Sequence, residues 1–125
     1  MTINAIQIFN FLRGAIRSTW GIEDFRGKRI AIIGMSSVGQ QLLALLCFDK
    51  VELLFHADSV VNYNAAYSLC RYATSLSPGE PENIDIAVNL TADYVTVIRD
   101  SKVKSFKLSD IGDDPYNQGI HEYYL

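Results

Sequence analysis

Apolar positions in the first twenty residues recur every three or four residues, which is the spacing of one face of an amphipathic helix. These positions are Ile3, Ile6, Phe9, Leu12, Ile16 and Trp20. Gly21 follows them and is suited to end a helix, because glycine accepts the left-handed conformation common at helix C-termini. The pattern therefore predicts an N-terminal helix over residues 1–21.

Three later segments, 29–33, 51–56 and 84–90, are apolar without alternation. Continuous apolar character is typical of strands covered on both faces, as in a parallel sheet with helices on each side. A leucine-rich segment over 40–48 separates the first two strands and predicts a helix. Strand, helix and strand in that order form a βαβ unit.

The rest of the chain continues the alternation of strands and helices. A second helix is expected over 60–76, with its inner face formed by Val61, Ala65, Leu69, Tyr72, Ala73 and Leu76. The Pro- and Gly-containing segment 77–83 predicts a loop. A short helix or turn over 94–100 and a fourth strand over 103–108 follow.

This order of elements predicts an α/β fold, a three-layer Rossmann-type domain with a mostly parallel sheet and an N-terminal amphipathic helix. We expect residues 1–125 to form one domain, with the helix over 1–21, the core over 28–112 and a tail over 113–125. The N-terminal helix would cover one face of the sheet or meet a partner subunit. In the second case a two-fold homodimer is the commonest outcome.

Composition and charge narrow the class of protein. The chain has 125 residues and a net charge of -3, and 49% of its residues are apolar, as in a globular domain. Lys102, Lys104 and Lys107 form a loose basic group that is typical of a solvated strand edge, so no nucleic-acid partner is expected. Cys47 and Cys70 have neither zinc-site nor disulfide spacing and are expected to be buried. No secretory signal or membrane span is recognised, and a cytoplasmic location is expected.

The turn after the first strand is the strongest candidate for a ligand site. Residues 34–39 place Gly34 and Gly39 at the first and third positions of a dinucleotide-binding glycine turn, with Ser36 at the second. The helix N-terminus and the Ser36 and Ser37 hydroxyls could bind a phosphate. Alternatively, the two glycines serve only a tight turn and close packing, with Ser36 or Ser37 capping the helix.

Further candidates follow the second and third strands. Asp58 lies where an acidic residue would accept hydrogen bonds from the adenosine ribose and would favour NAD over NADP, although Asp58 or Ser59 could instead cap the next helix. The full set of expected cofactor-binding residues is Gly34, Met35, Ser36, Ser37, Val38, Gly39, Asp58, Asn89, Leu90 and Thr91. Residues 109–112 are expected near the same crevice. No catalytic residue and no metal site is recognised.

Several of these segments resemble a known group of cofactor domains. Residues 21–34, which read GIEDFRGKRIAIIG, are similar to the entry of the NAD(P) domain in the amino-acid-dehydrogenase-like group. Residues 34–39, which read GMSSVG, are similar to the turn of methylenetetrahydrofolate dehydrogenase/cyclohydrolase but one residue shorter. Segments 85–89 and 106–112 resemble its later strands. Leucine/glutamate-type dehydrogenases and adenosylhomocysteinase look similar in the first half of their cofactor domains.

This resemblance covers most of residues 10–112 and implies a Rossmann fold with NAD or NADP as the cofactor. The resemblance implies that Gly34, Ser36 and Gly39 occupy the turn that binds the cofactor's phosphates. In these families the catalytic lysine belongs to a separate N-terminal domain, so the resemblance carries over no catalytic residue.

Three functions are compatible with these features. The first is a stand-alone NAD(P)- or nucleotide-binding module that senses the cofactor or serves as the cofactor subunit of a catalytic partner protein. The second is a small oxidoreductase whose active site is shared across a homodimer, with His56, Asp58 and Asp110 as candidates in the crevice. The third is a ligand-free scaffold or protein-interaction domain, suggested by Ser36 and by an aromatic tail with Tyr116, Tyr123 and Tyr124.

Overall fold

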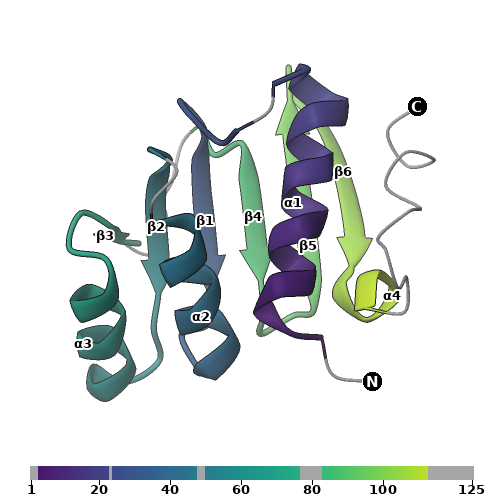
Figure 1. Cartoon of the computed structure of the whole chain (residues 1–125). Helices are drawn as coiled ribbons and strands as arrows, with labels where there is room; N and C mark the ends of the chain where they lie inside the picture. Colours follow the sequence, from purple (N-terminus) through teal and green to yellow (C-terminus); the bar gives the residue numbers. More distant parts are fainter. Residues whose placement is uncertain (1–2, 23, 48–49, 77–82, 113–125) are drawn as a thin grey trace.

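A computed structural model describes residues 3–22, 24–47, 50–76 and 83–112 of the chain. These residues form one six-stranded sheet, with the strands in the order β3-β2-β1-β4-β5-β6 (Figure 1). The elements along the chain are α1 (Ala5–Trp20), β1 (Arg29–Ile33), α2 (Ser37–Leu46), β2 (Glu52–His56), α3 (Val60–Leu69), β3 (Thr74–Ser75), β4 (Ile86–Asn89), β5 (Tyr94–Arg99), β6 (Lys102–Lys107) and α4 (Leu108–Gly112). The predicted tail, 113–125, lies outside the described residues.

Strand β1 occupies the middle of the parallel part of the sheet. It pairs in parallel with β2 on one side and with β4 on the other, so the chain runs outward from β1 to β3 and then returns to β4. A crevice opens at such a reversal of strand order, beyond the carboxyl ends of the strands. The predicted α/β, Rossmann-type fold with a mostly parallel sheet and an N-terminal helix is therefore confirmed.

The segment 94–100, predicted as a short helix or turn, is instead the antiparallel strand β5, so that prediction was wrong. Strands β4, β5 and β6 are joined as successive antiparallel neighbours. Left-handed backbone at Asp93, Asp100 and Ser101, with φ of 68°, 52° and 67°, makes the two reversals between these strands. Val95 and Val97 are buried and alternate with less buried residues, as expected for a strand with one covered face.

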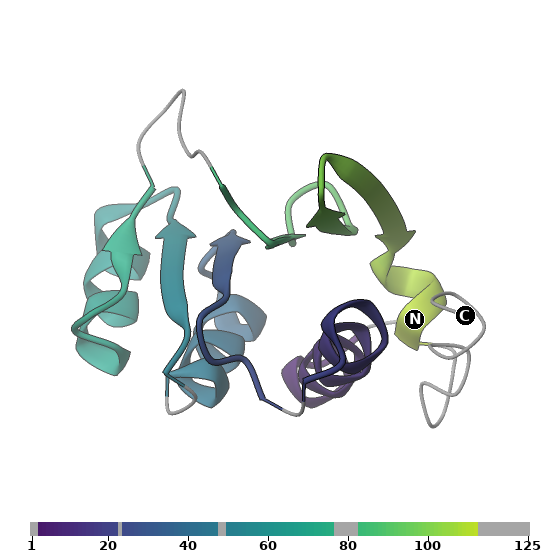
Figure 2. The same ribbon diagram turned by 90° about the horizontal axis from the view of Figure 1, so that it is seen from above.

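Helices α1, α2 and α3 all lie on one face of the sheet (Figure 2). The described residues therefore form two layers where the sequence predicted three. On the opposite face, Ala87, Thr96 and Ser105 lie side by side in register, and the Thr96 and Ser105 hydroxyls are 3.3 Å apart. These small and polar side chains explain why the apolar core lies between the sheet and the helices on the other face.

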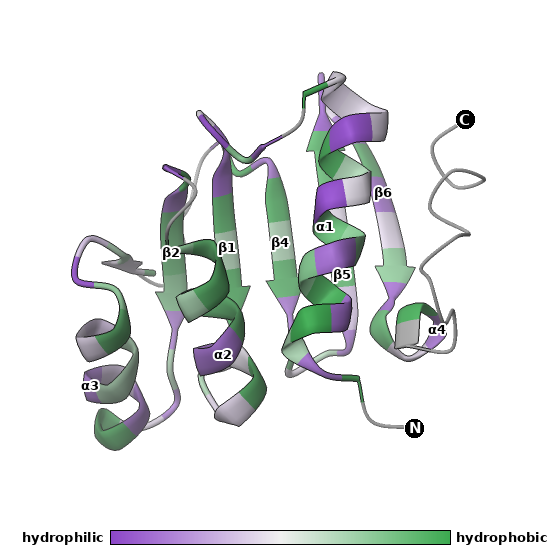
Figure 3. Cartoon of the chain, in the orientation of Figure 1, coloured by the Kyte–Doolittle hydropathy of each residue, from purple (hydrophilic) through white to green (hydrophobic). Residues whose placement is uncertain are grey.

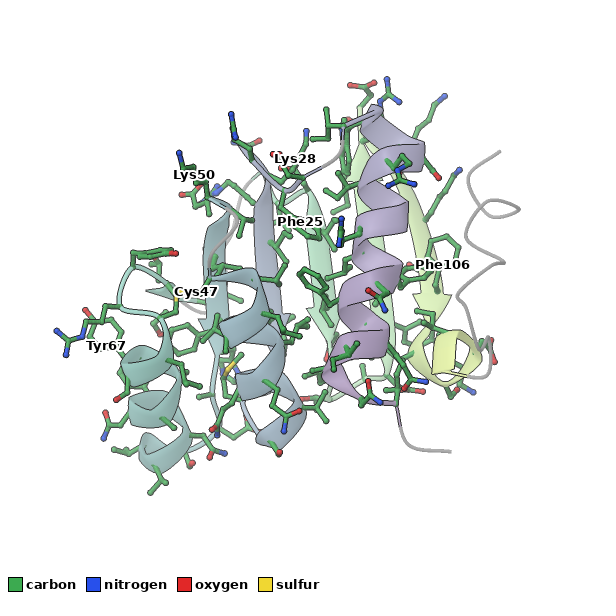
Figure 4. All side chains as sticks on the ribbon, viewed as in Figure 1. Phe25, Lys28, Cys47, Lys50, Tyr67 and Phe106 are labelled. Atoms are coloured by element: carbon green, nitrogen blue, oxygen red, sulfur yellow. The ribbon has the colours of Figure 1, made fainter. Side chains whose placement is uncertain are left out.

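The core is formed by β1, β2, β4 and β5 together with the inward faces of α1 and α2 (Figure 3). The inward side chains of α1 are Ala5, Ile8, Phe11, Leu12, Ala15 and Ile16, whereas Ile6, predicted on this face, is 62% exposed. Phe106 of β6 points toward α1 and meets Phe11 edge to face, with ring centroids 5.4 Å apart (Figure 4). Because the apolar face of α1 is covered by its own sheet, it gives no reason to expect a homodimer.

Helix α3 is shorter and less buried than the sequence predicted. It ends at Leu69, not near residue 76, and only its Ala66 is buried. Val61 and Leu69, predicted on the inner face, are 76% and 45% exposed. Across the described part of the chain, no helix combines the length and apolar character that crossing a membrane requires.

Candidate functional site

The glycine turn lies at the carboxyl end of β1, beside the carboxyl end of β4. Gly34 has a φ of +105°, a conformation that other residues rarely adopt. Its N–H donates to the carbonyl of His56 at 3.0 Å. A Cβ at Gly34 would lie 3.3 Å from the Leu90 Cβ and from the Thr91 Oγ1. The structure thus brings Leu90 and Thr91 against the turn, as their positions after β4 suggested.

Gly39 lies in the first turn of α2 and faces the turn backbone. A Cβ built at Gly39 would lie 2.0 Å from the carbonyl oxygen of Gly34 and 3.2 Å from Leu90 Cδ1. No larger residue fits there without moving the backbone. This is the close helix–strand packing expected of the third glycine in a dinucleotide turn.

The N-terminus of α2 presents free backbone donors at this turn. Ser36 is the N-cap residue, but its side chain makes no capping hydrogen bond, unlike Asn4 of α1 and Ser59 of α3. The first main-chain bond of the helix runs from the Gln40 N–H to the Ser36 carbonyl, at 3.0 Å. Within the described chain, no hydrogen bond therefore engages the N–H groups of residues 37–39. Such groups, together with the helix dipole, attract anions.

Side chains around the turn divide into buried and exposed sets. Met35, expected to contact the cofactor, is 1% exposed and belongs to the core, so it is closed to a ligand, and Val38 packs partly against the same core. Ser36 and Ser37 are exposed, and the Ser37 hydroxyl accepts from the Gln41 side chain at 3.2 Å. Both hydroxyls lie at the mouth of the helix N-terminus, where they can donate to an anion.

Gln40 supports the turn, although nothing in the sequence singled it out. Its side-chain nitrogen donates to the Met35 carbonyl at 2.9 Å and lies 3.5 Å from the Asn62 Oδ1. The residue therefore ties the glycine turn to the beginning of α3. A glutamine in the first turns of a leucine-rich helix carries no signal for this role, because its partners depend on the fold.

Asp58 follows β2 and does not cap the next helix. That role belongs to Ser59, whose hydroxyl accepts from the Asn62 N–H at 3.1 Å. The Asp58 carboxylate lies 3.6 Å from the His56 Nδ1, and its side chain is 75% exposed. Of the two capping residues that the sequence allowed, Ser59 is therefore the one that caps α3. The Asp58 carboxylate remains accessible to a ligand.

Asp58 lies in a hollow of about 260 Å³ at the carboxyl end of β2. The hollow is lined by Ala57, Asp58, Ser59, Val60 and Tyr63. Tyr63, which the sequence did not identify, packs against Phe55 of β2 with ring centroids 5.5 Å apart. An aromatic ring, an exposed carboxylate and a concave surface together suit a nucleoside, which has a flat base and ribose hydroxyls.

Asn89 and residues 109–112, which were also expected near the cofactor, have local structural roles. The Asn89 side chain accepts from the Ala92 N–H at 2.9 Å, which ties off the end of β4. Residues 109–112, expected near the crevice, lie in α4, which packs on α1 and β6. Strand β6 is separated from β4 by β5, so the structure does not bring α4 to the glycine turn.

Two kinds of polar group lie near the turn. Anion-binding amides and hydroxyls gather at the start of α2, and an exposed carboxylate lies beyond β2. Among the described residues, no three of the His, Cys, Asp and Glu side chains are grouped so that they could hold a metal ion.

Comparison with known proteins shows that this chain has a fold similar to that of a solved structure. No protein-family model matches the chain, and no curated protein matches it either. A solved structure, L-tryptophan dehydrogenase from Nostoc punctiforme, superimposes with a TM-score of 0.63 and 22% sequence identity over 70% of this chain. The matched part is 26% of the dehydrogenase, so the chain spans about a quarter of that protein. At this identity the two proteins share a fold, and activity does not follow from it.

Proposed function

We propose that this protein is an NAD(P)-binding Rossmann module that senses the cofactor or serves as the cofactor subunit of a separate catalytic protein. The observation that carries the proposal is the N-terminus of α2, which follows the carboxyl end of β1 at the reversal of strand order and has no side-chain cap or hydrogen bond on the N–H groups of residues 37–39 among the described residues. A dinucleotide pyrophosphate is an anion of the kind that such a terminus binds.

The neighbouring residues support an orientation for the ligand. The pyrophosphate would meet the α2 amides and the Ser36 hydroxyl, while the adenosine would occupy the hollow that contains Asp58 and Tyr63. The other end of the dinucleotide would extend past Thr91, which lies against Gly34. When bound, a nicotinamide cofactor supplies hydride transfer, and this chain contributes binding and orientation.

The test is calorimetric titration of the protein with NAD, NADH, NADP and NADPH, repeated on Ser36→Asp and Ser36→Asn. Aspartate and asparagine are both favourable N-cap residues, so both variants should keep the fold. The aspartate variant places a negative charge where the pyrophosphate would lie. We expect at least a tenfold loss of affinity for Ser36→Asp and less than a threefold change for Ser36→Asn.

Two results would contradict the proposal. One is an absence of heat with all four nucleotides, which would favour the scaffold function. The other is an equal loss of affinity in both variants, which would show that charge at the start of α2 is irrelevant. Circular dichroism of each variant provides the control for folding.

Cofactor preference is tested at Asp58. Its exposed carboxylate would accept hydrogen bonds from the ribose hydroxyls of NAD and repel the 2′-phosphate of NADP. In Asp58→Asn, we expect the ratio of NAD to NADP affinity to fall at least tenfold. Asp110→Asn, on α4, is the matched control and should leave the ratio unchanged. An unchanged ratio in Asp58→Asn would remove this residue from the proposed site.

A further inference from the structure

Strand β6 forms one edge of the six-stranded sheet, and among the described residues it pairs with β5 alone (Figure 1). It is six residues long, Lys102–Lys107, whereas β3 at the opposite edge has two residues. Very short strands protect the edges of many sheets, because they offer little backbone to another chain. That protection applies to β3 and not to β6.

The register of the β5–β6 hairpin decides which main-chain groups of β6 face outward. In an antiparallel pair, residues that exchange hydrogen bonds with the partner strand alternate with residues whose N–H and C=O point away from it. The Leu108 N–H donates to the Asp93 carbonyl at 2.9 Å, so in this register every second residue before Leu108 also bonds to β5. The residues that bond to β5 are Phe106, Lys104 and Lys102. The outward residues are Val103, Ser105 and Lys107.

These outward main-chain groups are available to an added strand. Within the part of the chain that the structure describes, the N–H and C=O groups of Val103, Ser105 and Lys107 make no hydrogen bond. They recur every second residue, which is the spacing at which a neighbouring strand presents its own donors and acceptors. The Ser105 side chain does not occupy them, because its hydroxyl lies 3.3 Å from the Thr96 hydroxyl. The edge is therefore a template for strand addition.

The charge of β6 selects among possible partner strands. The strand carries lysine at 102, 104 and 107 and has no acidic residue. Lys104 already has an interaction of its own, whereas Lys102 and Lys107 form no ion pair with a described carboxylate. A second copy of this chain would bring an equally basic strand, and like charges that face one another across a strand pair are destabilising. The edge therefore disfavours a second copy and favours an acidic segment.

The two faces of β6 differ at this edge. Phe106 packs on α1, so Lys102 lies on the α1 side and Val103 on the opposite face of the sheet. Val103 is 59% exposed, beside its half-buried register partner Ile98. An added strand would place alternate side chains on these two faces. Acidic residues would then lie on the side of Lys102, and apolar residues would cover Val103.

We propose that the outer edge of β6 binds an extended acidic segment of another protein, which adds a seventh strand to the sheet. In this mode of recognition, main-chain hydrogen bonds supply affinity and alternate side chains supply specificity. The first come from Val103, Ser105 and Lys107, and the second from the charge of Lys102 and Lys107 and from the exposed Val103 side chain. The interaction does not depend on the cofactor proposal, because β5 and β4 separate β6 from the strand that leads into the glycine turn.

The experiment is amide hydrogen exchange of the ¹⁵N-labelled protein, followed by NMR, in the presence of the synthetic peptide TVEVEVEVT. This peptide alternates acidic and apolar residues as the two faces of β6 require. The amides of Val103, Ser105 and Lys107 should exchange at least tenfold more slowly at saturation, because each gains an acceptor. The uncharged peptide TVQVQVQVT should bind at least fivefold more weakly, and the basic peptide TVKVKVKVT should give no protection.

Two sets of variants separate the main-chain contribution from the charge. Ser105→Pro removes one outward N–H and should weaken binding of TVEVEVEVT at least tenfold. Proline is tolerated on the outer side of an edge strand, so the hairpin should remain. Ser105→Ala keeps the N–H and is the matched control, with a change of less than twofold. The double variant Lys102→Gln and Lys107→Gln should weaken TVEVEVEVT at least fivefold and leave the affinity for TVQVQVQVT unchanged.

The proposal is overturned if excess peptide leaves exchange at Val103, Ser105 and Lys107 unchanged, or if the acidic and uncharged peptides bind equally. Equal effects of Ser105→Pro and Ser105→Ala would also overturn it. Protection of the same amides that rises with protein concentration alone would assign the edge to a second copy and exclude the acidic partner. Circular dichroism checks the fold of each variant, and the peptide comparison and the lysine variant still decide if Ser105→Pro fails to fold. Failure here leaves the dinucleotide proposal intact, since no peptide readout involves the glycine turn.

Discussion

Gly39 is a glycine within a helix, where alanine would normally be favoured by about 1 kcal/mol. Its presence is explained by the Gly34 carbonyl oxygen, which lies 2.0 Å from the position of an added Cβ. Glycine therefore lowers the stability of the helix itself, but it allows α2 to pack directly against the turn. Gly27 provides a contrast, because it has a φ of +79° with nothing within 4 Å of an added Cβ.

The first prediction compares these two glycines. Gly39→Ala should lower the free energy of unfolding by about 3 kcal/mol, because the methyl group forces the backbone apart. Gly27→Ala should cost about 1 kcal/mol, the strain of the left-handed conformation alone. Urea unfolding measures both values. Equal losses would mean that α2 shifts easily, and that the close packing on Gly34 is not a constraint.

Cys47 and Cys70 form a pair that the sequence spacing did not suggest. Both thiols are buried, and the Cys47 Sγ lies 3.8 Å from the Leu69 carbonyl at the end of α3 (Figure 4). Burial, followed by the hydrogen bond that the Cys70 thiol donates to the neighbouring Cys47, raises the pKa of Cys70 from 9.0 to about 11. A hydrogen bond to Cys47 likewise raises the pKa of Tyr72 to about 12.

The second prediction concerns alkaline pH. The folded state holds the Cys70 proton more tightly than the unfolded state does, so this stabilisation is complete below pH 9 and decreases as the pH rises toward 11. We expect the unfolding free energy of the wild type to fall over this range, and to fall less in Cys70→Ala. Urea unfolding from pH 8 to pH 11 measures the difference. Parallel curves for the two proteins would exclude a contribution from Cys70.

At the residue scale, the sequence predicted the turn better than its surroundings. Gly34 and Gly39 follow from a motif whose spacing reflects backbone geometry. The choice of Ser59 over Asp58 as the cap of α3, and the roles of Gln40 and Tyr63, depend on contacts between separate elements. Such contacts have no local pattern, because they arise only when β2, α2 and α3 come together.

Among the elements, α1 ends where the sequence predicted, at Gly21, but begins at Ala5 and not at residue 1, because the capping box at Asn4 was not recognised. Asn4 accepts from the Gln7 N–H at 2.9 Å, and the Gln7 side chain accepts from the Asn4 N–H at 2.9 Å, which completes a capping box. Gly21 ends the helix with a φ of +69°, as predicted from its place after Trp20.

The third prediction tests this cap. Asn4→Ala should lower stability by about 1 kcal/mol, because it leaves the Gln7 N–H without its acceptor. Asn10→Ala, at an exposed position within the same helix, is the matched control and should be neutral or slightly stabilising. Thermal unfolding followed by circular dichroism measures both. A cost for Asn10→Ala as large as that for Asn4→Ala would argue against a specific capping effect.

The elements β5 and α3 were mispredicted for different reasons. In β5, alternating residues over 94–99 fit a strand, but the expectation of a parallel sheet favoured a crossover helix. In α3, Val60, Val61 and Leu69 remain exposed, so the apolar residues do not mark the buried face. The two-residue strand β3 is too short to produce any pattern.

At the scale of the whole molecule, a ligand that binds only the folded protein must stabilise it. The fourth prediction is therefore a rise in the melting temperature with NAD. At a concentration one hundred times the dissociation constant, the gain is about 2.7 kcal/mol. At the same concentration, the tenfold loss of affinity expected for Ser36→Asp reduces the gain to about 1.4 kcal/mol or less, and the rise in melting temperature should be correspondingly smaller. A rise of equal size in that variant would place the nucleotide elsewhere on the protein.

The packing of α1 also has a consequence for the order of folding. Phe11 of this helix packs on Phe106, and its C-terminal carbonyl at Thr19 receives the Arg99 guanidinium, so α1 depends on a hairpin about eighty residues further along the chain. The same helix also packs on α2, which follows it closely in sequence. Its apolar side can therefore be covered in two stages, first by α2 and later by the β5–β6 hairpin, and loop closure makes the second stage the slower one.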